Sequence, residues 1–214
     1  MNIAALRQSI RRAHQHEALH GTLARRLESR LPSLHRAIGL PPHDGLDSLS
    51  RFVAGYIDQV PELIEAAQAV AREAEIEAQI KPVMKVAEHF FLSPPTVLEG
   101  QEGLVGLLDE AYLAHRLIEE INDRYIVFVG QPLIPLDTTV ANLVAHQLIG
   151  EPFANKLDEA VLLAVNGLLG NTLMEQVSLQ AYRDRLLNPL TLNAWRRWPC
   201  LSRQFGVELR LSVA

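Results

Sequence analysis

The sequence contains a single cysteine and few aromatic residues, and each shortage limits the kind of fold it can form. Cys200 is the only cysteine among 214 residues, which excludes an internal disulfide and a zinc site built from several cysteines. Aromatic residues make up 6% of the chain, whereas alanine and leucine are frequent. This balance favours packing between helices over a β-sandwich.

Long apolar runs are also missing. Polar residues recur every few positions near the N-terminus, which is not the pattern of a secretory signal peptide. The longest apolar stretch, around residues 162–169, is too short to span a bilayer. From these features we expect a cytoplasmic protein with no membrane partner.

The charge is unevenly distributed along the chain. Residues 1–36 contain seven arginines and two glutamates, a balance of +5, so the remainder carries −10 of the total of −5. The basic N-terminal helix could dock on the acidic body or meet an acidic protein partner, but the sequence favours a solvated charged face. The overall acidity argues against nucleic acid as the main ligand.

Apolar periodicity, capping residues and prolines predict an all-α, single-domain bundle over residues 1–214, with about five main helices and an irregular C-terminal tail. Pro82 is expected to kink or break its helix near residues 78–81. A strand-like segment is expected at residues 207–213, but no sheet of three or more strands. The predicted helices cover about residues 2–31, 47–56, 61–92, 103–129, 138–149 and 152–187.

The residues from His16 to His20 read His-Glu-Ala-Leu-His and match the pattern H-E-x-x-H. On a helical projection, Glu17 and His20 occupy two positions of the apolar stripe of the first helix, and we therefore expect both to be buried. The apolar members of this stripe are Ile3, Leu6, Ile10, Ala13, Ala24, Leu27 and Leu31.

Two other helices carry ionisable residues on or beside their apolar faces. In the 103–129 helix, His115 lies on the predicted inner face and Glu119 at its edge, one turn away. In the 61–92 helix, Glu77 interrupts the apolar stripe. His146 is expected on the solvated side of its helix. The predicted solvent side of the 103–129 helix comprises Asp109, Arg116, Glu120 and Asp123.

These inward-facing groups are the basis of a metal hypothesis. An ionisable group on an apolar face is costly unless it is paired, hydrogen-bonded or bound to metal. The groups lie near the middle of three helices, so antiparallel packing would bring them to one height. Carboxylates combined with imidazoles bind iron or another divalent metal in helical bundles. The leading hypothesis is a di-iron-like oxidoreductase whose metal ligands are Glu17, His20, Glu77, His115 and Glu119.

The pattern departs from the usual bundle motif, because only one Glu-x-x-His is present and His115 is followed by Glu119 at i+4. One metal, or none, is therefore as compatible with the sequence as two. The sequence alone does not establish that the protein is an enzyme.

Two alternatives use the motif differently. A zinc metallopeptidase would need His16 and His20 as ligands, Glu17 as general base and a third ligand downstream. Leu23 stands where the extended motif of one peptidase class requires glycine, and no sheet is predicted before the helix. The other alternative is a metal-free interaction or regulatory protein. It would act through its basic first helix or the Arg/Trp segment at residues 195–198, on an acidic protein or a second copy of itself.

Overall fold

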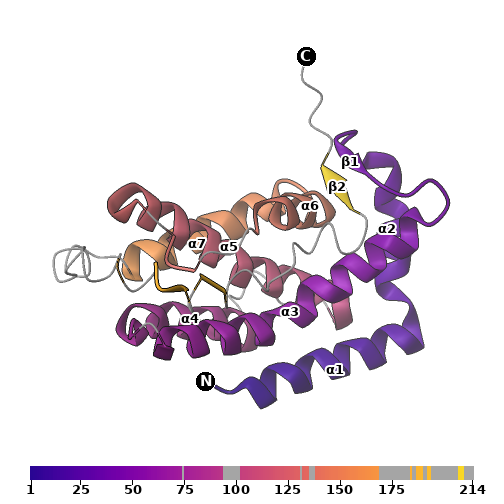
Figure 1. Ribbon diagram of the computed structural model, residues 1–214. Helices are drawn as coiled ribbons and strands as arrows, with labels where there is room; N and C mark the ends of the chain where they lie inside the picture. Colours follow the sequence, from indigo (N-terminus) through magenta and orange to yellow (C-terminus); the bar gives the residue numbers. More distant parts are fainter. Residues whose placement is uncertain are drawn as a thin grey trace.

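The computed structural model describes residues 1–73, 75–93, 102–130, 132–134 and 138–168, together with residues 184, 187–189, 192–193 and 207–209. The described part is an all-α fold, as predicted, with seven α-helices and a pair of two-residue strands (Figure 1). The helices are α1 (Ile3–His20), α2 (Thr22–Arg30), α3 (Gly45–Glu73), α4 (Glu77–Leu92), α5 (Gly103–Val129), α6 (Thr139–Ile149) and α7 (Phe153–Leu168). A short 3-10 turn, η1 (Leu31–Ser33), follows α2.

The predicted first helix is divided at Gly21. This residue adopts a left-handed conformation with a φ of 58°, which glycine reaches at little cost, and it ends α1 and begins α2. The prediction of one continuous helix over residues 2–31 was therefore wrong. The change of direction also interrupts the single apolar stripe expected along that segment.

The break between α3 and α4 lies between Glu73 and Glu77, and the prediction of a break at residues 78–81 was wrong. Pro82 lies inside α4. The N–H of Ile76 bonds to the carbonyl of Ala71, and that of Glu75 bonds to Arg72, the pattern of a Schellman helix end. Glu75 has a φ of 55°, so the left-handed position holds no glycine that could mark it in the sequence. Pro61, predicted to start a helix, lies inside α3, where the packing of its buried neighbours outweighs the lost backbone hydrogen bond.

The two strands form a minimal antiparallel ladder. β1 (Ile38–Gly39) pairs with β2 (Glu208–Leu209), which falls within the strand-like segment expected near the C-terminus. In the described part of the chain this sheet has two strands, so helix packing dominates the fold. None of the described helices is both long and apolar enough to cross a membrane.

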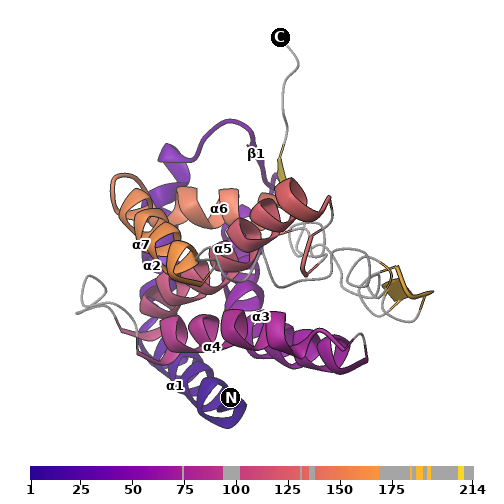
Figure 2. The same ribbon diagram turned by 90° about the vertical axis from the view of Figure 1, so that its left-hand side faces the viewer.

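Helix α5 is the centre of the bundle. It packs against α1, α2, α3, α4, α6 and α7, and Figures 1 and 2 show it between the α3–α4 side and the α6–α7 side. A helix covered on several sides has no broad solvent face. Of the residues predicted to face solvent, Asp109 is 1% exposed and only Asp123 is fully on the surface.

Helix α1 lies along one side of the bundle (Figure 1) and packs against α3, α4 and α5. Arg7 pairs with Glu65 at 2.6 Å, and His14 lies 2.8 Å from Asp58. The backbone N–H of Asn2 donates to Glu88. One of the seven arginines near the N-terminus is thus paired with a carboxylate of α3.

Candidate functional site

Glu17 of the H-E-x-x-H motif is a helix-capping residue in this structure. Its carboxylate accepts hydrogen bonds from the N–H of Leu23 at 2.7 Å, the N–H of Ala24 at 3.1 Å and the hydroxyl of Thr22 at 2.9 Å. Burial opposes its charge, but these hydrogen bonds outweigh that effect and lower its pKa. Glu17 therefore stabilises the first turn of α2 across the Gly21 turn.

The two histidines of the motif lie toward the surface. His20, at the end of α1, is exposed, so the prediction that it is buried was wrong. His16 is partly covered, lies 3.7 Å from Glu102, and places its ring 4.5 Å from that of His20. His20 is exposed because α1 ends at the Gly21 turn. The apolar stripe predicted to continue beyond His20 is therefore not on the same helix.

The remaining predicted ligands lie in different surroundings. Glu77 is exposed in the first turn of α4, where a carboxylate interacts favourably with the helix dipole.

His115 is fully buried, as predicted. Its Nε2–H donates to the carbonyl of Tyr56 at 2.9 Å, and its ring stacks on the Tyr56 ring with 4.2 Å between the ring centres. Burial lowers the pKa of His115 to about 4, although the bond to Tyr56 acts in the opposite direction, so this imidazole is neutral.

The structure does not bring the five predicted ligands together. Glu119 accepts a hydrogen bond from Asn142 and pairs with Arg116, away from the Glu17 cap and the exposed Glu77. Among the described residues, no three side chains of histidine, cysteine, aspartate or glutamate converge in a way that could bind a metal ion. The metal hypothesis thus gains no geometric support from the described part of the chain.

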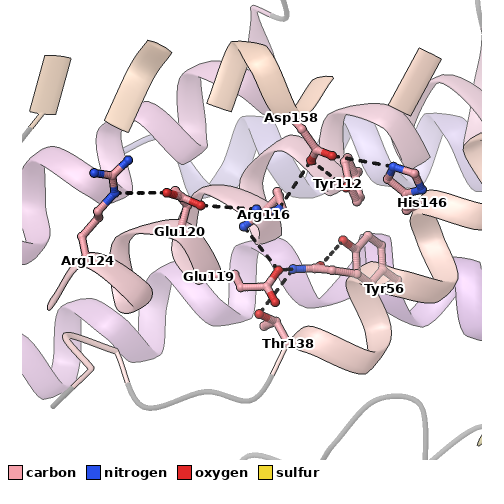
Figure 3. A network of polar contacts seen from close by, with 10 residues as sticks. Tyr56, Tyr112, Arg116, Glu119, Glu120, Arg124, Thr138, His146 and Asp158 are labelled. Carbon is pink, nitrogen blue, oxygen red and sulfur yellow. Dashed lines mark hydrogen bonds and ion pairs between the residues drawn. The ribbon is translucent and has the colours of Figure 1, made fainter. Parts of the chain in front are cut away.

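A different polar cluster forms where α5, α6 and α7 meet (Figure 3). At its centre, Arg116 lies within ion-pair distance of three carboxylates: Glu119 at 3.5 Å, Glu120 at 3.3 Å and Asp158 at 3.4 Å. Burial of the guanidinium opposes its charge, but these carboxylates outweigh that effect and raise its pKa. Arg124 also pairs with Glu120, at 3.2 Å.

One side of the cluster continues into the core through an amide. The hydroxyl of Tyr56 donates to Oδ1 of Asn142 at 2.7 Å, and Nδ2 of Asn142 donates to Glu119 at 2.7 Å. Since a tyrosine hydroxyl here donates to an oxygen and a carboxylate only accepts, these bonds fix the orientation of the amide. Tyr56 and Asn142 thereby hold the Glu119 carboxylate in place.

The other side of the cluster is centred on Asp158 of α7. Its Oδ1 accepts the hydroxyl of Tyr112 at 2.8 Å, and its Oδ2 lies 3.6 Å from Nε2 of His146. The same His146 nitrogen lies 3.1 Å from Oδ1 of Asn155. Burial is the main cause that raises the pKa of both Tyr56 and Tyr112, so the two phenols remain neutral hydrogen-bond donors.

These residues surround a partly open cavity of about 280 Å³. Its lining combines one arginine and two carboxylates with a phenol, an amide, an imidazole and the apolar side chain of Leu143. A concave site with a few converging polar groups is the usual form of a small-molecule site. The lining residues are Tyr112, Arg116, Glu119, Thr139, Asn142, Leu143, His146 and Asp158.

Most of this cavity was missed by the sequence interpretation. Arg116 and Glu120 were assigned to a solvent-facing side, yet Glu120 keeps only 12% of its side chain exposed. A signal was present, because Tyr112, Arg116, Glu119 and Glu120 recur at helical spacing and form one polar face on α5. His146, interpreted as solvated, has 17% of its side chain exposed.

Comparison of the chain with models of protein families, with curated proteins and with solved structures finds no match.

Proposed function

We propose that the protein binds a small organic cation in the cavity between α5, α6 and α7. The observation that carries the proposal is the charge of the lining: two carboxylates, Glu119 and Asp158, face one arginine, Arg116, which is already engaged in three ion pairs. The arginine and the two carboxylates of the lining together carry a net charge of −1. A cation that enters the cavity therefore meets more carboxylates than positive groups, and the partly buried cavity screens their attraction less than bulk water would.

The accessible groups favour an ammonium with a short carbon skeleton. Asp158 keeps 29% of its side chain exposed and Glu119 keeps 18%, so both carboxylates can be reached from the cavity. Leu143, 48% exposed, supplies an apolar wall at the same cavity. A small anion would instead be repelled by the two carboxylates, which is why we assign a cation.

The arrangement supports recognition better than covalent chemistry. Burial holds the phenols neutral, and the described lining residues include no serine, cysteine or lysine. Arg116, Glu119, Asn142 and Tyr56 are fixed by mutual contacts, which gives a preorganised lining. We therefore assign the protein to the binding class, with a small-molecule ligand that differs from the protein partner considered from the sequence.

Calorimetric titration and thermal shift with ethanolamine and choline, compared with ethylene glycol and acetate, test the proposal. The cations should bind saturably and raise the melting temperature, because a ligand that binds only the folded state stabilises it. Leu143→Trp should block this effect by filling the cavity. Leu163→Trp, at a position on α7 that is 74% exposed and outside the lining, is the matched control. Equal effects of acetate, or cation binding unchanged in Leu143→Trp, would contradict the proposal.

A further inference from the structure

A second cavity lies at the elbow between the end of α3 and the start of α4, beside the Schellman turn. It has a volume of about 230 Å³. Ala71 of α3 and Ile80 of α4, 2% and 1% exposed, form part of its lining. The cavity therefore has an apolar floor built from two helices, and it is separate from the Arg116 cluster.

The rim of this groove is positively charged. Arg72, Lys81 and Lys85 line it, and Glu77 is the only acidic residue among the described lining residues. Two of the three lysines in the whole sequence thus lie at this one groove, on a chain whose net charge is −5. Lys81 and Lys85 are four residues apart, so they project from the same face of α4.

The cations of the rim are not used within the described part of the fold. No described residue forms an ion pair with Arg72, Lys81 or Lys85. All three rim side chains belong to exposed residues and can reach a ligand in the groove. Positive charge concentrated beside an apolar floor fits a ligand with one anionic end and one apolar end.

Met1 also contributes to the groove. Met1 lines it, and its sulfur accepts a hydrogen bond from the amide of Gln68 at 3.1 Å. A methionine side chain is unbranched and adaptable, so it can cover an apolar chain without demanding one shape. Met1 thus adds an apolar side chain to the lining of the groove.

We propose that this groove binds an amphiphilic carboxylate, a compound with one carboxylate and a short unbranched alkyl chain. The carboxylate lies among Arg72, Lys81 and Lys85, and the alkyl chain lies on Ala71 and Ile80. The limited volume selects a short chain over a long-chain lipid. This site is independent of the cation-binding cavity and stands or falls separately from it.

Titration of the full chain with octanoate by calorimetry tests the assignment. We expect saturable binding with one site at low ionic strength, and weaker binding as salt is added, because the rim charges are exposed to screening. The double variant Lys81→Gln/Lys85→Gln should lose roughly tenfold or more in affinity. Both lysines are exposed, so the fold should persist, which circular dichroism checks.

Matched controls define the result that overturns the proposal. Lys156→Gln changes the third lysine, which is exposed on α7 and outside the groove, and should leave octanoate binding unchanged. 1-Octanol has the same chain and no charge, and it should bind more weakly than octanoate. Absence of saturable octanoate binding, equal binding of 1-octanol, or undiminished binding by the double variant would each refute the assignment.

Discussion

The carboxylate of Glu17 accepts the backbone N–H of Leu23 at 2.7 Å, across the left-handed Gly21 turn that joins α1 to α2. This bond ties two helices of different direction together at the point where an unbroken helix was expected. It also gives the glutamate of the H-E-x-x-H motif a structural role in the chain, because the carboxylate caps a helix N-terminus.

Replacement of Glu17 by alanine should destabilise the protein by about 1 kcal/mol, the usual contribution of a capping side chain. The folded pKa of Glu17 is lowered, so its contribution is present above its unfolded value of about 4.5 and is lost as pH falls through the folded value. Denaturant unfolding at neutral and acidic pH measures this difference. Glu28→Ala, an exposed position in α2, is the control and should show neither effect.

Asp109 should make the protein less stable as the pH rises. Burial raises its pKa from 3.8 to about 7, an effect that Arg26 only partly offsets, and neither of its oxygens has a hydrogen-bond partner among the described residues. Between those values the unfolded state loses a proton that the folded state keeps, so stability falls as pH rises toward 7. Asp109→Asn should flatten this part of the curve of melting temperature against pH.

The exposed Asp123 of the same helix provides the comparison, and Asp123→Asn should leave the curve unchanged. Burial raises the pKa of the neighbouring Glu110 to about 8, with Asp109 adding to the shift. Glu110 therefore also lowers stability as pH rises from 4.5 to about 8, and this part of the decline should persist in Asp109→Asn. A curve identical to that of the original chain from pH 4 to pH 7 would show that Asp109 is ionised without penalty.

Tyr56→Phe should cost about 1 kcal/mol of stability, because Oδ1 of the buried Asn142 would lose its hydrogen-bond donor. The same change should weaken cation binding in the cavity, since Asn142 would no longer hold Glu119 in one position. A double-mutant cycle with Asn142→Ala isolates the pair. If the two changes lower the free energy of unfolding additively, the Tyr56–Asn142 hydrogen bond does not contribute to stability.

Chelation should leave the melting temperature of the untagged protein unchanged, because the residues predicted from sequence as metal ligands do not share one site in the described structure. Elemental analysis of the same sample is the direct measurement. Stoichiometric iron or another divalent metal, together with a chelator-dependent melting temperature abolished by His115→Ala, would restore the oxidoreductase hypothesis.

The helical class and several helix limits follow from local signals in the sequence. The predicted helix over residues 103–129 matches α5, and that over 138–149 nearly matches α6, because glycines and prolines beside them end the helices. The break after α3 was misplaced, since its left-handed residue is Glu75 and carries no such signal. The Arg/Trp segment at residues 195–198, and most of the predicted helix beyond residue 168, lie outside the described residues.

The sequence by itself determined that His115 lies in the core, because apolar residues surround it at helical spacing. Only the tertiary structure decided what surrounds the other polar residues. Periodicity identifies one apolar stripe, whereas α5 is covered by helices on several sides, so Arg116 and Asp109 are enclosed although they lie off that stripe. Asp158 reaches Arg116 from a helix some forty positions away in the chain, and such contacts depend on how helices pack and not on local spacing.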